Sequence, residues 1–139
     1  MRVILDTVVL VRALINPYGL WGRLIFEHGK RYDMVVSPPV VREYLDVIRR
    51  PELTRKYRNA TTRNPHVMLD LLAQAEVVVV DHIPVVSRDP KDDPFLETAR
   101  VGVVDFIVSE DRHLLDLVEH AGIPIITGDA FIAILDVAD

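Results

Sequence analysis

Four acidic side chains stand at positions where a metal site can form. Asp6 ends the apolar run "RVILD", and Asp111 ends the run "VDFIVSED". Asp93 opens the helical pattern "DPFLETARVG", and Glu43 lies at the edge of the apolar arc of "SPPVVREYLDVIRR", where a carboxylate needs a partner. Carboxylates that converge repel one another, and a bound divalent cation offsets that repulsion. With no cysteine and no clustered histidine, oxygen ligands favour Mg²⁺ or Mn²⁺ over zinc.

Each of these acids also has an ordinary structural interpretation. Asp6, Asp93 and Asp111 all precede or open predicted helices, where an aspartate caps the free backbone N–H groups. Glu43 can pair with a neighbouring arginine such as Arg42 or Arg49. The sequence alone leaves the capping and metal-binding interpretations open for each acid, and it is the set of four that favours a site.

Short apolar runs and helical patterns alternate along the chain and position these acids. The predicted strands are 2–6, 32–37, 76–81, 104–111 and 123–127. The predicted helices are 7–16, 19–30, 37–50, 64–75, 93–102, 111–122 and 128–138. This alternation predicts an α/β fold with a mostly parallel sheet covered on both faces. In such folds ligands bind at the carboxyl ends of the strands, where Asp6 and Asp111 are expected.

Composition limits the class of protein. The 139 residues predict a single domain, 1–139, and half of them are hydrophobic, which excludes a disordered chain. No apolar stretch approaches the roughly 20 residues of a membrane helix, so we expect a cytoplasmic protein. The net charge of −5 does not indicate a nucleic-acid-binding protein, although the stretch 49–63 is strongly basic. That stretch is either a solvated surface or a path for an anionic substrate.

The order and spacing of four motifs resemble the PIN domain family, in its subgroup of toxin components of toxin–antitoxin pairs. The motifs are "LDTVVL", "SPPVVREYLDVI", "RDPKDDPFLETA" and "FIVSED". Asp93 and Asp111 stand eighteen positions apart, which matches the usual separation of the two late family acids, so this spacing favours Asp93 over its neighbour Asp92. Asp89, in the preceding loop, is expected to be solvated.

The resemblance implies a three-layer α/β/α fold with a central, mostly parallel sheet of about five strands. It also implies a Mg²⁺- or Mn²⁺-dependent ribonuclease, a hydrolase in which Asp6, Glu43, Asp93 and Asp111 bind the metal, directly or through water. Thr7 and Ser109 are candidate hydroxyls that orient carboxylates or water, and Asp105 is expected to be structural or one step removed from the metal. The candidate RNA contacts in the basic stretch are Arg49, Arg55, Lys56 and Arg58.

The resemblance also implies a protein antitoxin as partner, and self-association into a homodimer or higher homo-oligomer is expected. Leu20, Trp21 and Phe26 are candidate apolar contacts for either, or simply core residues.

One position departs from the family pattern. Where the family usually has asparagine, this chain has Val8, which cannot hydrogen-bond to the acids or the substrate. Three interpretations of Val8 stay open. The enzyme is active at a lower rate, or a hydroxyl such as that of Thr7 or Ser109 takes the place of the asparagine amide. In the third, the domain acts as an RNA- or protein-binding module with weak or no catalysis. A phosphatase-like domain with Asp6 as phosphoryl acceptor is a weaker alternative, because "LDTVV" lacks a second early aspartate.

Overall fold

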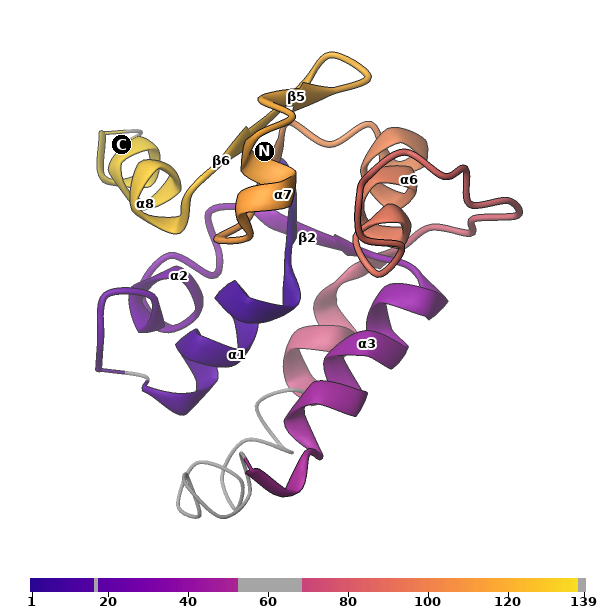
Figure 1. The fold of residues 1–139 in the computed structure, drawn as a ribbon. Helices are drawn as coiled ribbons and strands as arrows, with labels where there is room; N and C mark the ends of the chain where they lie inside the picture. The colour runs from indigo at the N-terminus through magenta and orange to yellow at the C-terminus, as the bar shows by residue number, and fades with distance from the viewer. Residues whose placement is uncertain (17, 53–68, 138–139) are drawn as a thin grey trace.

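Strands and helices alternate along the chain in the computed structural model, which describes residues 1–16, 18–52 and 69–137 (Figure 1). The strands are β1 (Arg2–Leu5), β2 (Asp33–Val36), β3 (Glu76–Val77), β4 (Phe106–Val108), β5 (Glu119–His120) and β6 (Ile123–Ile126). The helices are α1 (Thr7–Ile15), α2 (Gly22–Phe26), α3 (Pro38–Ile48), α6 (Asp93–Gly102), α7 (Arg112–Leu115) and α8 (Gly128–Val137). Residues 69–74 form a further helical segment before β3. None of the helices described is long and apolar enough to span a membrane.

Six strands form a sheet in the order β3-β2-β1-β4-β6-β5. β5 runs antiparallel to β6, and the other neighbouring pairs are parallel. In the view of Figure 1, α2 and α8 lie to one side of the central strands and α3 and α6 to the other. The predicted three-layer α/β architecture and its mostly parallel sheet are confirmed, with six strands in place of about five.

The additional strand is β5, which falls where the sequence pattern predicts the end of a helix. Helix α7 ends at Leu115, and Val118 then adopts a φ of 65°, outside the helical region. A tight turn through Ala121 and Gly122, with φ values of 52° and 78°, joins β5 to β6. Two successive positive φ values match the turn that hairpins favour, so antiparallel pairing replaces the last helical turns.

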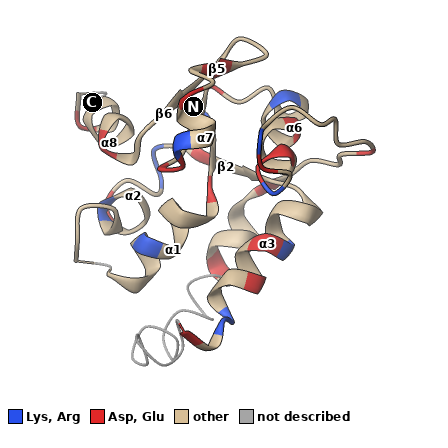
Figure 2. Ribbon diagram, in the orientation of Figure 1, with Lys and Arg blue, Asp and Glu red and all other residues tan. Residues whose placement is uncertain are grey.

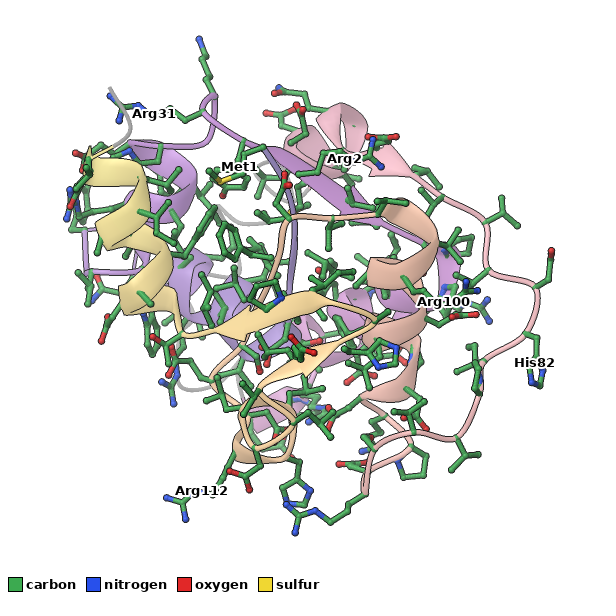
Figure 3. The ribbon with its side chains drawn as sticks, turned by 90° about the horizontal axis from the view of Figure 1, so that it is seen from above. Met1, Arg2, Arg31, His82, Arg100 and Arg112 are labelled. Atoms are coloured by element: carbon green, nitrogen blue, oxygen red, sulfur yellow. The ribbon has the colours of Figure 1, made fainter. Side chains whose placement is uncertain are left out.

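Strand β3 is shorter than the predicted strand 76–81. It pairs with β2 only at Glu76 and Val77, after which the chain leaves the sheet. Of the valines beyond it, Val79 and Val85 are exposed, at 69% and 88%. In Figure 3 the labelled His82 projects from this segment, away from the body of the ribbon.

The central strand β1 positions the first residues of the candidate site. Its Val3, Ile4 and Leu5 are fully buried, and it pairs with β2 on one side and β4 on the other. The register with β4 places Leu5 opposite Val108. Because parallel strands end at the same edge of a sheet, the residues that follow Leu5 and Val108 lie next to each other.

Candidate metal site

Asp6 and Ser109 meet where β1 and β4 end. The Ser109 hydroxyl donates a hydrogen bond to Oδ2 of Asp6, and its Oγ accepts one from the Asp111 N–H at 2.9 Å. Ser109 is fully buried. One hydroxyl therefore fixes the Asp6 carboxylate and the backbone of Asp111 together, which is the orienting contact expected of Ser109.

Asp6 is buried and forms no ion pair with a basic side chain in the described residues. It is 5% exposed and caps α1 through Oδ1, which accepts a hydrogen bond from the Val9 N–H at 3.2 Å. Burial raises the pKa of Asp6, and the bonds from Ser109 and the backbone offset part of that rise. None of the ion pairs formed within the described ranges includes Asp6, so its charge lacks the partner that a buried carboxylate ordinarily has.

A pocket of about 210 Å³ opens beside Asp6 and collects acids from four separate segments. Its lining consists of Asp6, Thr7, Val8, Glu43, Val47, Arg50, Asp89, Lys91, Asp92, Phe95 and Asp111. Figure 2 shows acidic positions on α3, the helix that contributes Glu43 to this lining. The structure thus brings Asp6, Glu43 and Asp111 together, as the sequence predicts.

Asp92, and not Asp93, lines this pocket. Asp93 is 3% exposed, and its Oδ1 accepts hydrogen bonds from the N–H groups of Ser87 at 2.7 Å and Val86 at 3.2 Å. Its carboxylate holds the loop before α6. Because one residue at a helix start turns a side chain by about 100°, the neighbouring Asp92 points elsewhere. The placement does not support the choice of Asp93 from its spacing to Asp111.

Asp92 has the features of a carboxylate that lacks a partner. It is 8% exposed, it makes no side-chain capping bond, and its buried Oδ2 has no hydrogen-bond partner. Burial first, and then the negative charges of Asp111, Asp89, Asp6 and Asp93, raise the pKa of Asp92 to about 7. A carboxyl group perturbed in this way within a pocket is a candidate functional group.

Glu43 and Asp111 complete the acidic lining. Glu43 is half-buried on α3, and no ion pair in the described residues joins it to Arg42 or Arg49, the two arginines that its structural interpretation offered as partners. Asp111 caps α7, since its Oδ1 accepts a hydrogen bond from the His113 N–H at 2.8 Å. Capping and pocket lining are therefore compatible for Asp111, because one oxygen caps and the other remains available.

The other predicted polar residues divide between the pocket and the far end of the sheet. Thr7 lines the pocket, and its buried Oγ1 has no hydrogen-bond partner. Asp105 precedes β4 at the opposite end of the strand, where it accepts a hydrogen bond from the Arg2 N–H at 2.8 Å. Asp105 is therefore too remote to orient a pocket ligand and belongs to the structural alternative.

Sequence reasoning missed two charged residues of the lining, Asp89 and Lys91, and placed a third, Arg50, in the basic stretch 49–63 that it offered as a substrate path. Asp89, expected to be solvated, is half-buried in the pocket, and Lys91 and Arg50 bring positive charge to it. The signal available for two of them was the clustering of charge in "RDPKDDP". Arg49 follows α3 and is exposed, whereas the predicted RNA contacts Arg55, Lys56 and Arg58 lie outside the described residues.

The donor set of the pocket fits a hard divalent cation. Its carboxylates, the unpartnered Oδ2 of Asp92 and the unpartnered Oγ1 of Thr7 are all oxygen ligands of the kind that Mg²⁺ and Mn²⁺ prefer. No three of these acids bring ligand oxygens within 4.8 Å of one another, a separation that like charges favour.

Elsewhere in the described residues, only Glu27, His28 and Asp136 are clustered that closely. Arg23 already binds both of their carboxylates, at 2.8 and 2.7 Å. An arginine in that position satisfies the acids that a cation would need, so this cluster is an ion-pair network between α2 and α8.

Comparisons with known proteins agree with this fold. The chain resembles the crystal structure of PAE2754 from Pyrobaculum aerophilum, with a TM-score of 0.64 and 15% identity over 98% of this chain and 90% of that one. It also resembles VapBC2 from Rickettsia felis, solved bound to a DNA fragment from their promoter, with a TM-score of 0.59 and 11% identity over 91% of this chain and 98% of that one. At such identities these likenesses establish the fold. No curated protein matches the sequence.

The family itself follows from the sequence. The PIN domain model matches residues 2–113, which include every acid of the pocket. This chain therefore belongs to the PIN domain family, whose members are generally nucleases.

Proposed function

We propose that residues 1–139 form one nuclease domain that hydrolyses RNA phosphodiester bonds with the help of Mg²⁺ or Mn²⁺. The observation that carries this proposal is the pocket that Asp6, Glu43, Asp92 and Asp111 line together with Asp89, where five acids stand against two cationic side chains, Arg50 and Lys91, in the described lining. Asp6 and Asp92 are buried, and buried acids in such surroundings are unfavourable unless a cation binds there. Asp6, Glu43, Asp92 and Asp111 are the proposed metal ligands, with Asp92 in the role that the spacing to Asp111 predicts for Asp93.

The residues of the pocket have distinct tasks in this proposal. A divalent cation held by the carboxylates supplies water activation and charge stabilisation for phosphodiester hydrolysis. Ser109 holds Asp6 in one orientation through its hydroxyl. Thr7 offers a free hydroxyl to water or phosphate, and Lys91 places positive charge where the RNA backbone approaches. No cysteine nucleophile is required, which suits a chain that has none.

We further propose that the nuclease is the toxin of a toxin–antitoxin pair and acts in the cytoplasm. The likeness to VapBC2, together with the family resemblance, supports this role. A partner surface is available around α1 and the start of α2, where a pocket of about 460 Å³ is lined by Arg12 and Ile15 of α1 and by Leu20 and Trp21 just before α2, among others. Leu20 and Phe26 are each 51% exposed, whereas Trp21 packs under the Arg12 guanidinium at 4.6 Å.

The direct test is cleavage of single-stranded RNA by the wild type and by Asp6→Asn, with Mn²⁺ or with EDTA. The wild type is expected to cleave only with metal. Asp6→Asn, which keeps a capping oxygen but loses the charge, is expected to lose at least about 100-fold in rate, the upper range for groups that only orient metal ligands. Equal residual cleavage by both proteins would identify a contaminating nuclease and refute the assignment.

A second candidate function is an RNA- or protein-binding module with weak or no catalysis. Val8 favours it, because this side chain lines the pocket, is 42% exposed and offers neither donor nor acceptor. We expect Val8→Asn to raise the cleavage rate several-fold at unchanged Mn²⁺ affinity, since the amide adds a hydrogen-bonding group without a charge. If the wild type binds RNA but Val8→Asn still cleaves nothing, the binding-module function is favoured.

A further inference from the structure

Tyr44 makes a buried contact that has no part in the proposed roles of the pocket residues. It follows Glu43 on α3 and is fully buried, and its hydroxyl donates a hydrogen bond to the Leu5 carbonyl, one residue before Asp6. A single side chain thus joins the helix that carries Glu43 to the strand end that carries Asp6.

The Leu5 carbonyl depends on this donor. The parallel pairing of β1 with β2 joins Arg2 to Asp33 and Val3 to Met34, and it does not extend to Leu5. Beyond β2 the chain enters α3 at Ser37, and none of the backbone hydrogen bonds found there in the described residues reaches the Leu5 carbonyl. Leu5 is fully buried, and a buried carbonyl without a donor is unfavourable. The Tyr44 hydroxyl therefore fixes the end of β1 at the point where the metal ligand begins.

The Tyr44 ring reaches a third acid-bearing element. Its centroid lies 6.0 Å from that of Phe95 on α6, with the planes tilted by 53°. Phe95 stands three residues after Asp92 and lines the acidic pocket. Tyr44 therefore touches β1 and α6 while it belongs to α3, and these three elements place Asp6, Asp92 and Glu43.

We propose that Tyr44 is a positioning residue for the metal site, because its hydroxyl and ring set the spacing of Asp6 relative to Glu43 and Asp92. The proposal rests on the proposed function insofar as it concerns a metal. Its structural part, the control of the Asp6 carboxylate by Tyr44, holds in the metal-free protein as well.

The chain contains a matched control in Tyr32. Its hydroxyl also donates to a backbone carbonyl, that of Leu24 at 2.7 Å, and its ring packs edge-on against Phe131 with centroids 5.3 Å apart. Tyr32 is 8% exposed and does not line the acidic pocket. Tyr32→Phe thus removes the same kind of buried hydrogen bond from another part of the molecule.

The experiment compares Tyr44→Phe and Tyr32→Phe in the full chain. Three readouts are measured: melting temperature in EDTA, the ¹³C chemical shift of the Asp6 side-chain carboxyl in metal-free protein, and Mn²⁺ affinity by calorimetry. Both variants are expected to melt at lower temperature. Only Tyr44→Phe is expected to move the Asp6 signal and to weaken Mn²⁺ binding, by about tenfold, the low end for groups that orient ligands.

Two results would overturn the proposal. One is an unmoved Asp6 signal and wild-type Mn²⁺ affinity in Tyr44→Phe, and the other is an equal change in Tyr32→Phe. If Tyr44→Phe does not fold, the hydrogen bond is tested in the wild type by NMR. The Tyr44 hydroxyl proton is expected to give a slowly exchanging signal, and rapid exchange refutes the hydrogen bond. If the wild type binds no Mn²⁺, the proposed function fails, while the Asp6 signal still decides the role of Tyr44.

Discussion

Asp92 and Asp93 occupy successive positions and make opposite contacts. Asp93 accepts two backbone hydrogen bonds from the preceding loop, whereas Asp92 faces the pocket with a buried, unpartnered oxygen. From its spacing to Asp111, the sequence predicted that Asp93 joins Asp6, Glu43 and Asp111. The spacing is a poor guide here, because the choice depends on where the loop through Ser87 folds back, and no local pattern encodes that contact.

The raised pKa of Asp92 leads to a prediction about pH. Metal binding requires the carboxylate form, and the pKa of Asp92 lies at about 7. We expect Mn²⁺ affinity to fall by up to about tenfold for each pH unit below 7 and to level off above it, because one proton competes with the metal. Calorimetric titrations between pH 5 and 8 measure this dependence. An affinity that does not change over that range would contradict it.

The stability of the metal-free protein provides the control for that prediction. A carboxyl whose pKa is raised above its unfolded value of 3.8 binds its proton more tightly in the folded state. Its contribution therefore makes the folded protein less stable as pH rises from about 4 to about 7. Asp92→Asn removes that contribution, so its melting temperature in EDTA is expected to exceed that of the wild type at pH 8 by more than at pH 5.

The elements show which parts of the fold local sequence determines. Strands β1, β2, β4 and β6 and helices α1, α3, α6 and α8 appear where apolar periodicity and capping residues predict them. β5 was missed because a short hairpin closed by Ala121 and Gly122 competes with a helical pattern of similar composition. β3 was predicted too long because its valines are β-branched, although only Glu76 and Val77 find a neighbouring strand.

The arrangement of elements also decides which predicted residues share a site. Asp105 and Asp111 flank the same strand, β4, and therefore stand at opposite edges of the sheet. Asp105 was expected to be structural or one step removed from the metal, and its place at the start of β4 favours the structural alternative. Lys91 and Arg50, in contrast, enter the pocket from a loop and from the end of α3, and only tertiary packing brings them there.

At the scale of the whole molecule, the exposed apolar side chains on α1 and α2 lead to a prediction about self-association. Leu20 is half-exposed beside the 460 Å³ pocket. If this surface joins two copies, Leu20→Glu is expected to shift the protein toward monomer, because it places a charge in an apolar contact. Light scattering after size-exclusion chromatography measures the change.

Val77→Glu is the matched control for that prediction. Val77 is 60% exposed on the edge strand β3, and the substitution adds the same charge at a different surface. It is expected to leave the oligomeric state unchanged. A monomeric wild type, or dissociation by Val77→Glu alone, would count against association through α1 and α2.

The central claim is that Asp6, Glu43, Asp92 and Asp111 form a divalent-metal site in a nuclease of the PIN domain family. The most direct test is Mn²⁺ titration of the wild type, Asp92→Asn and Asp93→Asn by calorimetry at pH 8. We predict about 10- to 100-fold weaker binding for Asp92→Asn, and affinity within about threefold of the wild type for Asp93→Asn, which instead loses thermal stability. Wild-type binding by Asp92→Asn, with loss of binding in Asp93→Asn, would contradict the account.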